Sequence, residues 1–101
     1  MTPKLDLIEG ETYKVVLFPR ERDAKVQYIG EANGNYVFHR KEEVILVDKS
    51  DAVRDGIVIT HNPDSEVHVR CIPTEAIYEE SDRNSRLINL LENAKKRGRR
   101  A

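Results

Sequence analysis

The sequence predicts a small, mainly β domain: an antiparallel barrel or strongly bent sheet of five or six short strands, followed by an amphipathic helix. Short runs of β-branched and aromatic residues follow one another at close spacing up to residue 72, with turn residues between them. After residue 73 the pattern changes to a helical one and then to a basic end. The length of 101 residues suits one domain and not two.

The first hairpin lies within residues 24–47, because Asn33-Gly34 tolerates the positive φ angles of a tight turn. A two-residue turn at this position would place Tyr28 opposite His39 and mix polar with apolar residues on both faces of the hairpin. A three-residue loop over residues 32–34 places Tyr28 opposite Phe38 and sorts the faces better. We therefore predict the three-residue loop.

This register has two further consequences. Gly30 comes opposite Tyr36, whose ring would cover the space that a strand glycine leaves. Ile29 and Val37 share the other face with mostly polar residues. The predicted core face consists of Val26, Tyr28, Tyr36 and Phe38.

Four more strands are expected. The run 44–47 is continuously apolar, which predicts a strand that is covered on both faces. The turn residues at 62–65 predict a second hairpin over residues 56–72. The expected strands are residues 12–18, 44–47, 56–60 and 66–72.

The segments between these strands are polar. Residues 19–23 are predicted to form a charged loop, and residues 48–55 a loop with one helical turn at 51–53. Residues 1–9 leave two alternatives open. Their alternation suits an extended strand, whereas Thr2-Pro3 suits the start of a short helix.

The C-terminal part divides into a helical turn, a longer helix and a tail. Residues 74–79 are expected to form one turn capped by Thr74, and Ser81 or Asp82 is expected to cap a helix over residues 81–97. Leu87, Leu90, Leu91 and Ala94 give that helix an apolar stripe. The expected organisation is a β-barrel domain over 1–80, the helix over 81–97 and a basic tail over 98–101.

Two segments resemble parts of SH3-like barrels. The opening Leu7–Phe18, LIEGETYKVVLF, is similar to their first strand, which follows a glycine turn. The turn Thr74–Glu79, TEAIYE, is similar to their short closing helix. The resemblance implies an SH3-like barrel architecture, and it implies no particular function because these barrels support many functions.

Charge is distributed unevenly along the chain. The end of the chain carries five basic residues and no acid, while the rest carries twelve basic and eighteen acidic residues, a net charge of −6. Such an end attracts phosphates while the acidic body repels them. The basic residues are Lys95, Lys96, Arg97, Arg99 and Arg100.

No segment has the pattern of a signal peptide or of a membrane span, so the expected location is the cytoplasm. Cys71 is the sole cysteine and has no partner for an internal disulfide. The potential metal ligands His39, His61, His68 and Cys71 have no metal-site spacing. We expect no metal, no cofactor and no catalytic residue, and hence not an enzyme.

The leading hypothesis is therefore a non-enzymatic protein-interaction module in which Leu87 and Leu91 of the helix contact a protein partner. The alternative is a nucleic-acid accessory protein that binds phosphates through the five basic residues at its end. The expected oligomeric state is a monomer or a homodimer formed through the helix. Packing of the leucine stripe on the chain's own barrel is the other possible arrangement of this helix.

Overall fold

The structure is a computed structural model that describes residues 5–17, 21–61 and 69–98. It contains one sheet and two helices within these ranges. The strands are β1 (Thr12–Leu17), β2 (Glu21–Ala32), β3 (Asn35–Arg40), β4 (Glu43–Asp48), β5 (Ala52–Asp55), β6 (Val58–His61) and β7 (Arg70–Pro73). The helices are α1 (Thr74–Glu79) and α2 (Ser85–Gly98).

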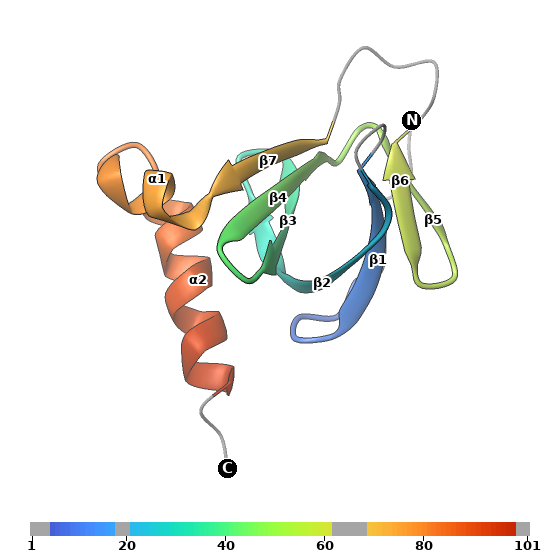
Figure 1. Cartoon of the computed structure of the whole chain (residues 1–101), viewed down its shortest axis with the longest axis horizontal. Helices are drawn as coiled ribbons and strands as arrows, with labels where there is room; N and C mark the ends of the chain where they lie inside the picture. Colours follow the sequence, from blue (N-terminus) through green and yellow to red (C-terminus); the bar gives the residue numbers. More distant parts are fainter. Residues whose placement is uncertain (1–4, 18–20, 62–68, 99–101) are drawn as a thin grey trace.

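The sheet has seven strands in the order β5-β6-β1-β2-β3-β4-β7, rather than the five or six expected. It curls around an apolar interior, and α2 lies on the opposite side of the molecule from the β5–β6 hairpin (Figure 1). No strand pairing joins the edge strands β5 and β7 in the described residues, so the sheet is not closed. The mainly β class with a C-terminal helix is confirmed, whereas the closed SH3-like barrel is not.

The predicted second hairpin is wrong. β6 forms an antiparallel hairpin with β5 and lies parallel to β1, while β7 pairs with β4. The expected turn at 62–65 lies outside the described residues. The loop and helical turn predicted over residues 48–55 are also corrected, because Ala52–Asp55 forms the edge strand β5. Likewise, β2 begins at Glu21, within the predicted charged loop.

The first hairpin has the two-residue turn of one predicted register and the Tyr28–Phe38 pairing of the other. Asn33 and Gly34 both have positive φ and form a two-residue turn, since Ala32 pairs with Asn35. The predicted three-residue loop is therefore wrong. The register then shifts between Tyr28 and Gly30, where Ile29 forms a β-bulge, so that Tyr28 still pairs with Phe38.

The inner face of the curled sheet carries the main core. The predicted aromatic face is confirmed, because Tyr28, Tyr36 and Phe38 are all buried there. Their rings and that of Tyr13 pack edge to face or tilted, with centroids 5.4–6.4 Å apart in neighbouring pairs. The cluster comprises Tyr13, Val15, Leu17, Ala24, Val26, Tyr28, Tyr36, Phe38, Ile45, Val47, Ala52 and Ile59.

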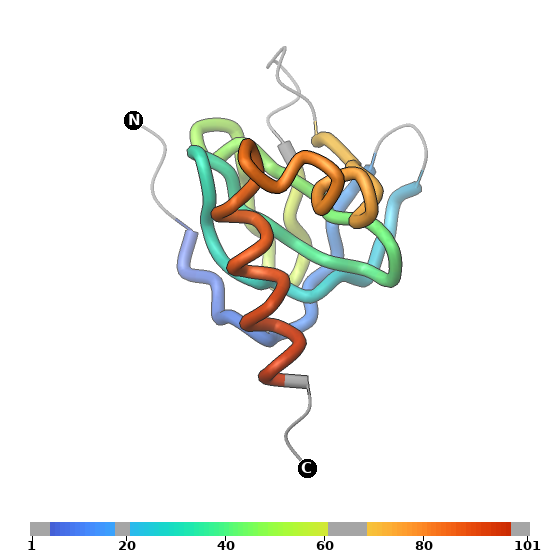
Figure 2. Tube along the Cα trace, turned by 90° about the vertical axis from the view of Figure 1, so that its left-hand side faces the viewer, coloured from blue at the N-terminus to red at the C-terminus, as the bar shows by residue number. Residues whose placement is uncertain are grey.

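The outer face of β2, β3 and β4 carries a second core under the two helices (Figure 2). Val44 and Leu46 of β4 point outward into this cluster while Ile45 and Val47 point inward, which confirms that the strand is covered on both faces. The outer cluster comprises Ile29, Ala32, Val37, Val44, Leu46, Ile77, Leu87 and Leu91.

Gly30 lies directly under Leu90 of α2. Its φ is +138°, and a methyl group on its Cα would lie 2.5 Å from Leu90 Cδ2. Gly30 pairs with Val37 and not with Tyr36, so the predicted aromatic cover is wrong. The helix fills the space instead, because Leu90 occupies it.

The described part of the N-terminal segment, residues 5–11, is neither a helix nor a strand. Two tyrosine hydroxyls of the inner core hold it in place. The Leu5 amide donates to Tyr36 Oη at 2.8 Å, and the Ile8 amide donates to Tyr13 Oη at 2.9 Å. Buried tyrosines thus satisfy their polar ends by binding the segment that crosses the sheet.

The helix boundaries differ from the predicted caps. Thr74 begins α1 after Pro73, and no side chain caps that end of the helix. α2 begins at Ser85 rather than near Ser81 or Asp82, since residues 80–83 form a turn. The Asn84 side chain donates from Nδ2 to the Ile77 carbonyl oxygen at 3.1 Å and joins the two helices.

Candidate functional site

The leucines predicted to bind a partner are buried within the chain. Leu87 is 5% exposed and Leu91 is 2% exposed, and both pack on the outer face of the sheet. A helix of this length is marginal alone and gains stability from such packing. The prediction that Leu87 and Leu91 present a partner-binding surface is therefore corrected: their apolar surface is already covered.

The basic residues at the end of α2 have different surroundings. Lys95 and Lys96 are exposed, and Lys95 Nζ lies 3.4 Å from Tyr78 Oη and 5.2 Å from the centre of that ring. Arg97 is held against the body, because its Nη2 lies 3.2 Å from Glu9 Oε1. Arg99 and Arg100 lie outside the described residues. Within the described part of this predicted phosphate site, Lys95 and Lys96 thus have the more accessible cations.

The solvent face of α2 carries polar side chains at helical spacing. Arg86, Asn89, Asn93 and Lys96 are all exposed and follow one another at intervals of three or four residues. Glu92 lies to one side of this row and accepts a hydrogen bond from Tyr78 Oη at 3.1 Å. This face offers hydrogen-bond donors and positive charge.

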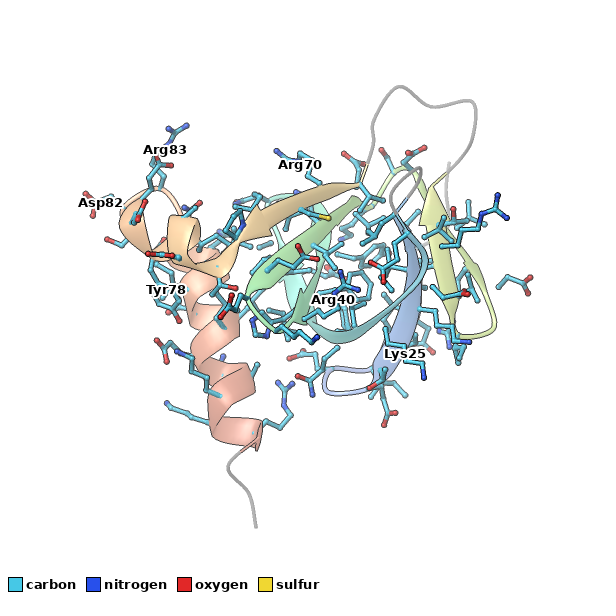
Figure 3. All side chains as sticks on the ribbon, viewed as in Figure 1. Lys25, Arg40, Arg70, Tyr78, Asp82 and Arg83 are labelled. Carbon is cyan, nitrogen blue, oxygen red and sulfur yellow. The ribbon has the colours of Figure 1, made fainter. Side chains whose placement is uncertain are left out.

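Three charged residues meet at one end of the curled sheet. Arg40 Nη1 lies 2.9 Å from Glu21 Oε1, and Arg40 Nη2 lies 2.8 Å from Glu43 Oε1 (Figure 3). The hydrogen bonds that Arg40 donates to Glu21 and then to Glu43 raise the pKa of Arg40. A shallow depression of about 510 Å³ opens beside this network and is lined by Arg40, Lys41, Glu42, Glu43 and Pro73. The two ion pairs hold the carboxylates of Glu21 and Glu43 on the Arg40 guanidinium.

His39 lies half-buried between the sheet and the helices. Its Nε2 is 3.4 Å from Thr74 Oγ1, and burial, followed by the nearby Lys95 ammonium, lowers its pKa below the ordinary value of 6.5. His61 and His68 have side chains outside the described residues, and Cys71 is partly buried beside the inner core. In the described part of the chain, no three potential ligands come together to hold a metal ion.

Apolar side chains are exposed at the β5–β6 side of the molecule. Ile8 is 61%, Val53 45% and Ile57 53% exposed. Two contacts connect the β5–β6 hairpin to β1 and to the segment that precedes Ile8. The Ile57 carbonyl oxygen accepts from the Lys14 amide at 2.8 Å, and the Arg54 guanidinium donates to the Asp6 carbonyl oxygen.

We define the exposed corner as Ile8, Val53 and Ile57 together with the edge strand β5. Sequence reasoning missed this corner because residues 48–55 looked like a loop. The dipeptide Gly56-Ile57 was the available signal, since a glycine in the first position favours a two-residue hairpin turn. Gly56 has a φ of +63°, and Asp55 pairs with Val58 across that turn.

Comparisons with family models, with curated proteins and with solved structures found no match to this chain. Neither helix of the described ranges is long and apolar enough to cross a membrane. The proposals for function therefore come from the geometry of the chain itself.

Proposed function

We propose that the chain is a non-enzymatic protein-interaction module that binds its partner at the exposed corner. The exposure of Ile8, Val53 and Ile57 beside a strand edge that no described strand pairs is the observation that carries this proposal. Large apolar side chains that gather at the surface favour protein contacts, whereas single ones are common and need no explanation. The SH3-like likeness and a cytoplasmic location belong to the same proposal.

A selection of random peptides on the immobilised full chain tests this function. We expect enriched peptides to bind the natural sequence and to lose binding to a Val53→Asp, Ile57→Asp double variant. Lys96→Asp is the matched control, because it changes a charge on the opposite side of the molecule. Peptides that bind the double variant equally well, or a selection that enriches none, would contradict the proposal. Circular dichroism of each variant confirms that the fold is retained.

The second candidate function, binding of nucleic acid, is supported by the exposed cations and amides along α2. Lys95 and Lys96 are accessible, and Arg86, Asn89 and Asn93 extend the same polar surface. Arginine, lysine and asparagine are the side chains that most often contact phosphates and bases.

Fluorescence anisotropy with a generic DNA duplex and a single-stranded RNA tests this second function. If it holds, binding at low salt weakens steeply as salt rises, and it is lost in a Lys95→Ala, Lys96→Ala variant. Arg83→Ala is the control, since Arg83 projects from the turn between the helices, away from the sheet (Figure 3). Absence of binding at low salt would remove this candidate.

A further inference from the structure

On one side of the β5 backbone, no strand of the described residues is paired. β5 is hydrogen-bonded to β6 alone among the described strands, and an edge strand leaves alternate N–H and C=O groups unpaired. The other edge, β7, ends at Pro73, which has no amide hydrogen, and continues directly into α1. Of the two edges, β5 is therefore the better acceptor for an added strand.

The side chains of β5 give that edge a chemical pattern. Ala52 belongs to the inner core, so Arg54 shares the inner face while Val53 and Asp55 point outward. Arg54 donates from Nε to the Gly56 carbonyl oxygen at 2.8 Å and lies 5.5 Å from the centre of the Tyr13 ring. Within the described residues, no carboxylate pairs with Arg54 and no cation pairs with Asp55.

A second copy of this chain does not suit the β5 edge. Two-fold related antiparallel strands place residues of the same sheet face opposite each other, which limits the registers available. The two registers with the greatest overlap are centred on Val53, which sets Asp55 opposite Asp51, or on Arg54, which sets Arg54 opposite Arg54. Like charges directly opposite each other destabilise a strand pair. The edge is thus protected against its own copy while it stays open to a different sequence.

We propose that β5 accepts an extended peptide segment of another protein as an additional antiparallel strand, with apolar, acidic and basic residues opposite Val53, Arg54 and Asp55. This inference rests on the proposed function and specifies the partner of the same corner. Backbone hydrogen bonds give such a strand affinity, while the side chains opposite it give specificity. In the antiparallel direction the basic residue of the segment comes directly before the acidic one.

The test uses two synthetic peptides of identical composition. Val-Tyr-Lys-Glu-Val-Thr sets lysine opposite Asp55 and glutamate opposite Arg54, and Val-Tyr-Glu-Lys-Val-Thr exchanges these two charges. Both are titrated into the full chain labelled with nitrogen-15, and amide shifts are followed by NMR. We expect the first peptide to shift the amides of β5 and to bind about tenfold more tightly, since two cross-strand charge pairs change sign. An Asp55→Lys variant is expected to lose that preference.

Other outcomes distinguish a failure of strand addition from a failure of the proposed interaction module. Equal affinity of the two peptides, or shifts at Ile8 and Ile57 without shifts in β5, would overturn strand addition and leave the interaction module standing. Failure of the peptide selection described above would overturn the module itself. Sedimentation that shows a dimer at rising protein concentration, abolished by Val53→Asp, would assign the edge to a second copy and overturn the inference.

Discussion

The two halves of the sheet are used in different ways. β2, β3 and β4 have apolar side chains on both faces and bury them under the inner core on one side and α1 and α2 on the other. β5 and β6 contribute Ala52 and Ile59 to the inner core, and their hairpin leaves Val53 and Ile57 exposed. The difference teaches that the helices cover the outer face of one half of the sheet, while the other half leaves apolar side chains exposed.

The largest expected effect comes from the inner core, which both halves share. Phe38 is 0% exposed and packs against Tyr13 and Tyr28. We expect Phe38→Ala to lower the free energy of unfolding by about 3–5 kcal/mol, because the lost ring leaves a cavity. Urea denaturation measures this loss. A loss below about 1 kcal/mol would mean that the aromatic face is not the core.

Substitutions should lower stability far more under the helices, on the outer face, than at the exposed corner. Leu91→Ala removes a buried side chain under the helix and is expected to cost about 2–4 kcal/mol. Ile57→Ala at the exposed corner is its matched control and should change the free energy of unfolding by less than about 0.5 kcal/mol. Similar losses in the two variants, compared by thermal unfolding, would contradict the distinction between the halves.

Gly30 tests how closely α2 lies on the sheet. We expect Gly30→Ala to cost about 1–3 kcal/mol, since alanine disfavours this positive φ and its methyl group meets Leu90. Combining it with Leu90→Ala should recover the part of the cost that comes from the clash. A double-mutant cycle by urea denaturation measures the coupling. Strictly additive losses would show that the helix is not in contact at Gly30.

The smallest effect concerns the pH dependence of helix docking at His39. The pKa of folded His39 lies below the unfolded value of 6.5, so the unfolded chain binds a proton first as pH falls. Its contribution to stability is thus present above 6.5 and decreases as pH falls below 6.5 towards the lower pKa of the folded state. We expect His39→Gln to flatten this part of the stability curve. An unchanged curve would remove His39 as the cause.

Local patterns in the sequence predicted which strand faces are apolar. They did not predict which strands pair when the strands are distant in the chain. The sorting of Tyr28 and Phe38 onto one face was correct, although a bulge at Ile29 and not a longer loop produces it. The parallel pairing of β6 with β1 has no local signal, because it depends on the curl of the whole sheet.

The candidate site was predicted less well than the fold. The stripe of Leu87 and Leu91 was recognised, but its partner is the outer face of the chain's own sheet. Ile29 and Val37 were the available signal, since they give β2 and β3 apolar side chains on both faces, as in strands that are covered on both sides. The exposed corner depends on the strand β5, which the polar composition of residues 48–55 did not indicate.

Amide hydrogen exchange followed by NMR tests the contrast between the two halves most directly. We expect the amides of β3, which pair on both sides, to exchange only through global unfolding. Amides of β5 that point away from β6 should exchange orders of magnitude faster, because none of the seven described strands covers them. Protection of those β5 amides equal to that of β3 would show that this edge is already occupied, and the account would fail.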